Sequence, residues 1–376
     1  MINHERLRRN FLELTVIEGV SGNEERIMNE IKGRLDRLDI QYAQDDAGNG
    51  FGGECGNVIA FIPGTEKGKP FFMSAHVDTI SSSSGKPVIR EGVFYSDGST
   101  ILGADDRAGV AAMLEAAEAV IEHNIPHTGL ELLFLVGEEI GLCGSKYLDY
   151  DLIKSASGFV LDSSADLGKV VSHAPTHSSC RITVRGKAAH GAIAPELGIH
   201  AIKIAADAIH NIEVGRVTDN TTVSIGTIKG GTKVNVVPDF VEIKGEIRSL
   251  DEAEIPEYTQ KIETCFRDAA EHYGGSIDIE WKSEYKGFKL DEGHNVIRWI
   301  IRAMEQADVI PGLIKFIGGS DANNFNRHGI PTINLGLGYK KNHSNEEYMK
   351  VDDLIGITEI VMELIRLSPQ YGDAQF

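Results

Sequence analysis

Three apolar runs of the sequence are each followed by a carboxylate or a histidine. Residues 70–73 precede His76, residues 129–136 precede two glutamates, and residues 158–161 precede Asp162. Runs of this length and composition predict buried strands. In open α/β sheets, ligands bind beyond the carboxyl ends of the strands. The pattern therefore favours a sheet with a polar site along one edge.

The order of the predicted elements indicates one domain inserted into another. Strands first alternate with helices, which predicts an α/β fold with a mostly parallel, helix-covered sheet. The order then becomes strand, helix, two strands, helix and strand, which is typical of a small α+β domain with a ferredoxin-like plan. We therefore predict a large domain of residues 1–176 and 288–376, interrupted by a small domain of residues 177–287.

Two amphipathic helices are predicted near the start of the chain. Residues 3–15 offer Leu7, Phe11 and Leu14 for burial on one face. Ser21 and Glu24 have the spacing of a capping box, which predicts a second helix start at Ser21.

Charge and hydropathy restrict the possible partners. Of 376 residues, 37 are Lys or Arg and 56 are Asp or Glu, which gives a formal net charge of -19. This argues against nucleic-acid and anionic-membrane partners, because both require a basic face. No apolar run approaches the ~20 residues needed to cross a bilayer, and residues 1–10 do not resemble a signal peptide. We therefore expect a cytoplasmic protein.

His76 and Asp78 can face one pocket at the end of their strand. Side chains two residues apart on a strand point to the same side. A neutral imidazole is a good zinc ligand, and its second ring nitrogen requires an acceptor such as Asp78. The alternative is that His76 only ends a strand and Asp78 only starts a turn, because the pattern is short and common.

Other acidic groups and one histidine follow predicted strands or begin a helix. Asp105 and Asp106 follow a glycine-rich approach to a helix, where capping would explain one carboxylate but not readily two. Glu138 and Glu139 project to opposite sides of an extended backbone, so one can bind metal while the other faces substrate or water. The alternative for this pair is an exposed acidic turn. His343 lies in a polar loop that can reach the same edge.

This mixture of side chains suits a divalent metal ion. Imidazole and carboxylate ligands favour zinc, or a related ion such as cobalt or manganese. The candidate ligands are His76, Asp105, Glu138 or Glu139, Asp162 and His343. They are sufficient for two ions that share a carboxylate at a separation of ~3.5–4 Å.

The motifs together resemble those of the di-zinc exopeptidase family that includes peptidase T, glutamate carboxypeptidase and the acetylornithine deacylases. They occur in the family's order at residues 74–79, 103–109, 137–141, 162 and 343–346. The resemblance implies that His76 and Asp162 hold one zinc ion, that Glu139 and His343 hold the other, and that Asp105 bridges both. It also implies that Asp78 orients His76 and that Glu138 is the general base for a water between the ions. Arg107 departs from the family pattern, in which lysine is commoner at that position.

The resemblance extends to the small domain, which would be a lid and dimerisation domain. It implies that His190 enters the active site of the partner subunit of a homodimer and stabilises the tetrahedral oxyanion. It further implies that Asn235, Arg248 and Gly319 contact substrate. The alternatives are that Asn235 shapes a turn, that Arg248 pairs with an acidic neighbour, and that the glycine loop at Gly319 is a tight turn into a helix.

The expected function is hydrolysis of short peptides by a di-zinc exopeptidase, with a tripeptide aminopeptidase as the specific prediction. One alternative is a deacylase or carboxypeptidase of the same family that acts on N-acyl amino acids, because the same metals and base serve both reactions. A second alternative is a non-catalytic metal-binding protein on the same fold. Hydrolysis of a panel of free and blocked substrates distinguishes the three.

Overall fold

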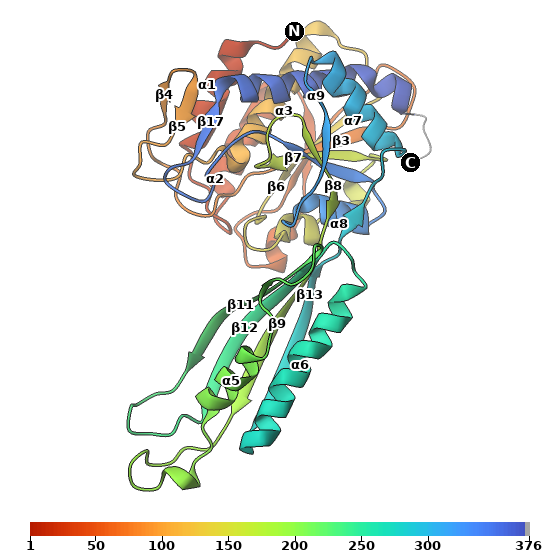
Figure 1. Ribbon diagram of the computed structural model, residues 1–376. Coiled ribbons are helices and arrows are strands. Elements are labelled where there is room, and N and C mark those ends of the chain that lie inside the picture. Colours follow the sequence, from red (N-terminus) through yellow and green to blue (C-terminus); the bar gives the residue numbers. More distant parts are fainter. Residues whose placement is uncertain (373–376) are drawn as a thin grey trace. The chain divides into compact units, whose positions relative to one another are not determined.

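A computed structural model describes residues 1–372 (Figure 1). The chain divides into two compact units. Unit 1 consists of Met1–Ser172, Lys289–Lys315 and the chain from Ser320 onward. Unit 2 consists of His173–Phe288 and Phe316–Gly319. The predicted large domain also includes residues 373–376, which lie outside the described residues.

Unit 1 is built on a nine-stranded sheet in the order β1-β2-β6-β3-β7-β16-β8-β14, with β15 paired to β8. The strands are β1 (Gln41–Gln44), β2 (Val58–Ile62), β3 (Phe71–His76), β6 (Leu130–Leu135), β7 (Gly158–Ser163), β8 (Lys169–Ala174), β14 (Phe288–Lys289), β15 (Gly312–Lys315) and β16 (Thr332–Gly336). The central strands β6, β3, β7 and β16 are parallel, whereas β2 and β8 pair with them in the antiparallel sense. The predicted α/β class is confirmed.

Helices cover both faces of this sheet. They are α1 (His4–Thr15), α2 (Glu25–Arg37), α3 (Ala104–His123), α4 (Cys143–Lys146), α7 (Asn295–Gln306), α8 (Asp321–Arg327) and α9 (Val351–Tyr371). The ring of Phe71 lies 4.8 Å from that of Trp299 in α7, and the ring of Phe72 lies 4.4 Å from that of Phe325 in α8. Since neighbouring strand residues point to opposite faces, α7 and α8 pack on opposite sides. Within residues 1–372, no helix is both long and apolar enough to span a bilayer.

A three-stranded sheet brings residues 348–350 beside a hairpin from much earlier in the chain. Its order is β17-β5-β4, with β4 at Val88–Arg90, β5 at Val93–Tyr95 and β17 at Tyr348–Lys350. Two single 3-10 turns, η1 (Ala47–Gly50) and η2 (Tyr150–Leu152), complete the regular structure of unit 1. The β17 pairing fixes the segment that follows His343.

The predicted capping box at Ser21 is wrong. Helix α2 begins at Glu25, and Glu24 at its N-cap position makes no side-chain capping bond. Instead, the Ser21 hydroxyl donates to Asp78 Oδ2 at 2.7 Å, and Glu24 Oε1 accepts the N–H of Gly137 at 3.0 Å. Ser21 is therefore bound to a residue distant in sequence, and Glu24 Oε1 accepts the local N–H of Gly22 at 2.7 Å in addition to that of Gly137.

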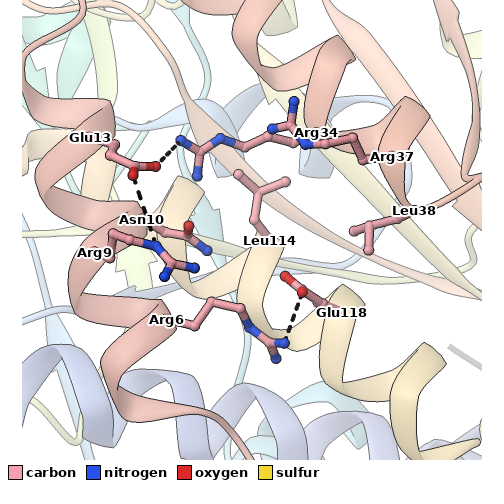
Figure 2. A pocket seen from close by; sticks show the side chains of 9 residues that line it. All are labelled: Arg6, Arg9, Asn10, Glu13, Arg34, Arg37, Leu38, Leu114 and Glu118. Carbon is pink, nitrogen blue, oxygen red and sulfur yellow. Dashed lines mark hydrogen bonds and ion pairs between the residues drawn. The ribbon is translucent and has the colours of Figure 1, made fainter.

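Buried ion pairs join α1 to α3. The Arg6 guanidinium makes five hydrogen bonds with Glu115, Glu118 and Glu122, of which the Nε–Glu115 Oε2 bond is 2.6 Å. A hollow of about 380 Å³ lies beside this network. Figure 2 shows the side chains that line it, among them arginines of α1 and α2. Arg34 in its wall is also paired, with Glu13 at 2.9 Å and Glu30 at 2.8 Å. Carboxylates thus already neutralise the buried arginines of the hollow.

Unit 2 has one antiparallel sheet in the order β10-β11-β12-β9-β13. Its elements are β9 (Thr176–Arg185), η3 (Pro195–Leu197), α5 (Ala201–His210), β10 (Gly215–Arg216), β11 (Thr221–Gly230), β12 (Phe240–Ser249), α6 (Glu254–Tyr273) and β13 (Ser276–Tyr285). Apolar residues of the sheet, such as Ile182 and Ile243, share a core with Phe266 of α6. The order of the long strands is that of a ferredoxin-like fold, as predicted.

Candidate metal centre

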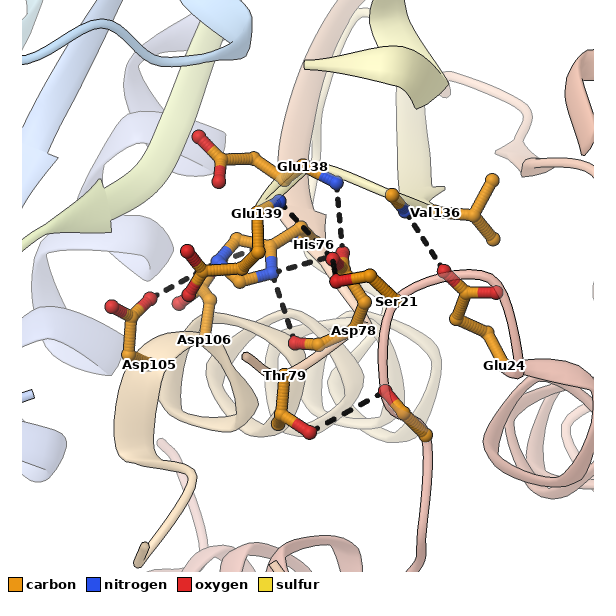
Figure 3. Close-up of polar contacts among 12 residues, drawn as sticks. Ser21, Glu24, His76, Asp78, Thr79, Asp105, Asp106, Val136, Glu138 and Glu139 are labelled. Atoms are coloured by element: carbon orange, nitrogen blue, oxygen red, sulfur yellow. Dashed lines mark hydrogen bonds and ion pairs between the residues drawn. The ribbon is translucent and has the colours of Figure 1, made fainter. Parts of the chain in front are cut away.

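The parallel strands of unit 1 bring the predicted polar residues to one edge. His76 is the last residue of β3, Asp162 lies near the end of β7, and Glu138 and Glu139 follow β6. His343 follows β16, which runs parallel to β7. Because parallel strands end at the same side of the sheet, residues far apart in sequence meet here (Figure 3).

Asp105 lies between the two histidines. Its Oδ1 is 3.0 Å from His76 Nε2, and its Oδ2 is 3.3 Å from His343 Nε2. His76 Nε2 also lies 3.5 Å from Asp162 Oδ1, and His343 Nε2 lies 2.8 Å from Glu139 Oε1. The structure therefore brings together all five predicted ligands as two histidine–carboxylate pairs with one carboxylate between them.

The irregular start of α3 directs Asp105 into this group. Asp105 (φ -81°, ψ 103°) and Asp106 (φ -118°, ψ 36°) both depart from helical geometry, and the peptide bond between them is cis. Asp106 accepts N–H bonds from Gly109 at 3.1 Å and from His76 at 3.3 Å. One oxygen of Asp106 also lies close enough to His76 and Asp162 to share an ion with them. Of the two aspartates, Asp105 is the one whose carboxylate contacts both histidine rings, and it is also the one that the family resemblance implies as the shared ligand.

Asp78 connects the ends of two strands. Its Oδ1 lies 3.3 Å from His76 Nδ1, and its backbone oxygen lies 3.1 Å from the same nitrogen. The Asp78 carboxylate also accepts the backbone N–H groups of Glu138 at 3.0 Å and of Glu139 at 3.1 Å (Figure 3). A single buried carboxylate therefore orients the His76 ring and fixes the backbone of both glutamates.

The carboxylates at the strand ends lie close together in a buried place, where a positive charge stabilises them. Removal from water raises the pKa of Asp162 to about 6 and that of Glu138 well above its usual range. Hydrogen bonds to Asp105 and Glu139 raise the pKa of His343 to about 10. Burial would also raise the pKa of Asp105, but hydrogen bonds from His343 and His76 outweigh burial and lower it. Carboxylates this close together are stabilised by a cation, and here protonated histidines occupy that role.

The donor set fits a divalent metal ion. Ligand atoms of His76, Asp105 and Glu139 lie within 4.8 Å of one another, and so do those of His76, Asp106 and Asp162. Imidazole nitrogens with carboxylate oxygens are typical ligands of zinc. A bound divalent ion would replace the protons that these groups otherwise require.

Three further residues support the group and were not predicted. Asn342 Nδ2 donates to Asp105 Oδ2 at 2.7 Å, and the Tyr339 hydroxyl donates to Asp162 Oδ1 at 3.3 Å. Glu347 is 1% exposed and accepts the N–H of Asp105 at 3.0 Å. The sequence signals for them are weak: Asn342 adjoins His343, but nothing distinguishes buried Glu347 from exposed Glu346.

Arg107 is fully buried behind these carboxylates. Its Nη2 donates to the backbone oxygen of Ile17 at 3.2 Å. Burial lowers its pKa only to about 10, so the side chain stays charged near neutral pH. Lysine is commoner at this position in the family pattern. Arg107 keeps the positive charge of a lysine, but its side chain has a different shape.

The four predicted substrate contacts all lie in unit 2 but not in one place. His190 pairs with Val236 in a short bridge, which brings it beside Asn235. Arg248 lies near the other end of β12, where its Nε contacts Glu246 at 3.1 Å. Gly319 lies against Tyr285, where an added Cβ would come within 2.3 Å of the ring.

Comparison with known proteins relates this fold to peptidases. Residues 175–274 match the family model described as a peptidase dimerisation domain, and residues 57–206 match that of peptidase family M28. The uncharacterized protein YqjE of Bacillus subtilis is 38% identical over 366 residues, which cover 97% of this chain and 99% of that protein.

Two solved structures are similar over nearly the whole chain. The aminopeptidase PepT of Bacillus cereus is 39% identical with a TM-score of 0.90, and the match covers 97% of this chain and 98% of that one. A tripeptidase of Staphylococcus aureus is 34% identical with a TM-score of 0.95, covering 98% of this chain and 100% of the other. Peptidase T of Shouchella clausii is 26% identical over 73% of this chain and 68% of its own length.

Proposed function

Because the chain belongs to the peptidase T-like family of metallopeptidases, we propose that it is an aminopeptidase that removes the first residue of short peptides, tripeptides in particular. The observation that carries the proposal is Asp105, which lies 3.0 Å from His76 and 3.3 Å from His343. A carboxylate shared by two histidine–carboxylate pairs is the ligand arrangement expected of a two-ion hydrolase.

Two divalent ions per subunit, zinc by preference and cobalt or manganese as substitutes, are proposed for this centre. His76 and Asp162 would hold one ion, Glu139 and His343 the other, and Asp105 both. Bound there, the ions would polarise the scissile carbonyl and make water a stronger nucleophile at neutral pH.

Glu138 is the proposed general base. Its backbone N–H is fixed by Asp78 at 3.0 Å, while its carboxylate is used by none of the ligand contacts described above. A raised pKa lets Glu138 take a proton from the attacking water and then give it to the leaving amine. Asp78 keeps the Nε2 face of the His76 ring directed at Asp105 and Asp162.

A homodimer through unit 2 would complete the site. Arg248 is eight residues along β12 from Phe240, the end of the strand near His190, so the two ends are roughly 26 Å apart at ~3.3 Å per residue. A single active site cannot receive both His190 and Arg248 from one subunit. His190 of the partner subunit would therefore stabilise the oxyanion, and Asn235 of the partner subunit, which lies beside it, would contact the peptide. Arg248 would be contributed to the same site by the other subunit. The match of residues 175–274 to a dimerisation domain supports this arrangement.

A substrate panel tests the proposal. Tri-alanine, di-alanine, an N-blocked tripeptide and N-acetyl amino acids are each incubated with metal-free protein and with added zinc, cobalt or manganese. Metal-dependent release of the first residue from tri-alanine, with little turnover of the blocked compounds, is the expected result. Turnover of N-acetyl amino acids instead would replace the aminopeptidase assignment with deacylation.

A further inference from the structure

A buried glutamate outside the ligand set holds the backbone that carries Asp105. Glu347 is 1% exposed. Its Oε2 accepts the N–H of Gly103 at 2.7 Å, and its Oε1 accepts the N–H of Asp105 at 3.0 Å. Both oxygens of one carboxylate are therefore bound to the same short segment of chain, two residues apart.

The start of α3 depends on such an acceptor. The first N–H groups of a helix have no partner inside the helix. Here the usual local cap is missing, because Gly103 has a left-handed φ of 74° and no side chain, and Asp105 is not helical. Glu347, 242 residues further along the chain, supplies from a distance the acceptor that an N-cap side chain normally provides.

The segment that supplies Glu347 also supplies a ligand and a second contact to Asp105. His343 Nε2 lies 3.3 Å from Asp105 Oδ2, and Asn342 Nδ2 donates to the same oxygen at 2.7 Å. Residues 342–347 thus hold Asp105 at its carboxylate and at its backbone. The Glu347 backbone is itself fixed, since its N–H donates to Ser344 O at 3.1 Å and its oxygen accepts the N–H of Ser96 at 3.3 Å.

We propose that Glu347 is a positioning residue for metal binding: its carboxylate locks the Gly103–Asp105 backbone to the His343 segment, so that Asp105 is aimed between the two histidines before any ion arrives. This inference rests on the proposed metal centre. Since Asp105 faces both histidines, loss of the lock affects both ions. Substitution of residues that orient metal ligands typically weakens metal binding by 10–100-fold.

The test compares Glu347→Gln with Glu346→Gln. Both replace a carboxyl group by an amide of the same size, but the Glu346 side chain is 74% exposed and pairs with Lys341 on the surface. In the Glu347→Gln variant, the amide NH₂ replaces one of the two oxygens and cannot accept the backbone N–H of Gly103 or Asp105 that this oxygen accepts. Zinc is titrated into chelator-treated protein by calorimetry, and the absorption spectrum of the cobalt-loaded protein reports ligand geometry. Glu347→Gln is expected to weaken both binding steps by about 10–100-fold and to alter the cobalt spectrum, whereas Glu346→Gln leaves both unchanged.

The outcomes separate the inference from the proposed function. Wild-type protein that binds no zinc removes the proposed metal centre and this inference with it. Wild-type protein that binds zinc, beside a Glu347→Gln variant with the same dissociation constants and cobalt spectrum, overturns the inference alone. A variant that merely melts at a lower temperature with unchanged metal affinity also overturns it, because the role of Glu347 is then only structural.

Two measurements keep the test decisive if Glu347→Gln does not fold. Glu347→Asp keeps the charge but shortens the reach, and weaker zinc binding in that variant supports the lock. Amide hydrogen exchange in metal-free wild-type protein examines the lock directly. Slow exchange at Gly103 and Asp105 supports it, and exchange at the rate of open loops contradicts it.

Discussion

Unit 1 contains two clusters of carboxylates, each with buried members, that differ in how they are neutralised. Between α1 and α3, Glu115 is fully buried and Arg6 is bound to it and to two further glutamates by five hydrogen bonds. At the strand ends, Asp105 and Asp162 are paired with histidine rings instead. In the first cluster a permanent cation binds the carboxylates directly. In the second, Arg107 is buried nearby, but the groups that contact Asp105 and Asp162 are histidine rings, which are cations only while they are protonated. A permanent cation makes a structural link, and a titratable one leaves room for an ion from solution.

If the strand-end cluster binds metal, removal of metal should have the largest effect of the changes considered, because it should alter both activity and stability. Treatment with a chelator is expected to abolish hydrolysis of tri-alanine, and zinc should restore it. The free energy of unfolding should also fall, by about 4 kcal/mol per ion when free metal is ~1,000 times its dissociation constant. Hydrolysis assays and denaturant titrations with and without chelator measure both effects. Full activity after complete metal removal would contradict the assignment of the strand-end cluster.

Glu138→Gln should have the next largest effect. The variant keeps its size but cannot accept a proton, so kcat should fall by about 10²–10⁴-fold. Zinc titration should give the stoichiometry of the wild type, because Glu138 is not a proposed ligand. Glu139→Gln is the matched neighbour, since it contacts His343 at 2.8 Å and should lose zinc affinity instead. Equal zinc loss in both variants would mean that the two glutamates do not have separate roles.

Arg6→Met tests the cluster between α1 and α3, in which Arg6 neutralises the glutamates. The substitution leaves the charge of buried Glu115 without its cation, although the N–H of Asn3 still donates to it at 2.6 Å. The free energy of unfolding should therefore fall by about 3–5 kcal/mol. Activity per folded molecule and its metal dependence should not change. Denaturant unfolding measures the loss. Arg8→Met is the control, because Arg8 pairs with exposed Glu5 at 3.2 Å and should cost no more than ~1 kcal/mol.

A paired replacement should have the smallest effect. Arg6→Met combined with Glu115→Met removes both buried charges and leaves apolar side chains of similar length. The double variant is expected to regain most of the lost stability, to within about 2 kcal/mol of the wild type, because a buried ion pair is often replaceable by packed apolar groups. A double variant less stable than Arg6→Met alone would show that the α1–α3 link needs its charges.

Much of the fold could be predicted because its signals are local. The apolar runs predicted β3, β6 and β7 within a few residues, and the amphipathic pattern of residues 3–15 predicted α1 (His4–Thr15). The ligand positions followed from strand direction, since residues after parallel strands meet at one edge. The structure brings His76, Asp162 and the two glutamates to that edge.

The parts that could not be predicted depend on contacts distant in sequence. Ser21 has the spacing of a cap but donates to Asp78, 57 residues later. Glu346 and Glu347 are identical in sequence terms, yet only Glu347 is buried, because the β17 pairing that follows it decides which of the two faces inward. The sequence around Arg6 does not indicate that it pairs with three glutamates of another helix.

The connection between unit 1 and unit 2 indicates where a segment of the chain can be replaced. The chain leaves along β8 and returns along β14, and these strands are neighbours in the sheet. Leu290 N–H donates to Ser172 O at 2.9 Å, so the two cut points of an excision already touch. Insertions are tolerated where chain ends lie close together. Residues 173–288, the larger part of unit 2, are therefore an insertion between two neighbouring strands of unit 1. A replacement of another length at this junction is expected to keep the order of the strands in unit 1.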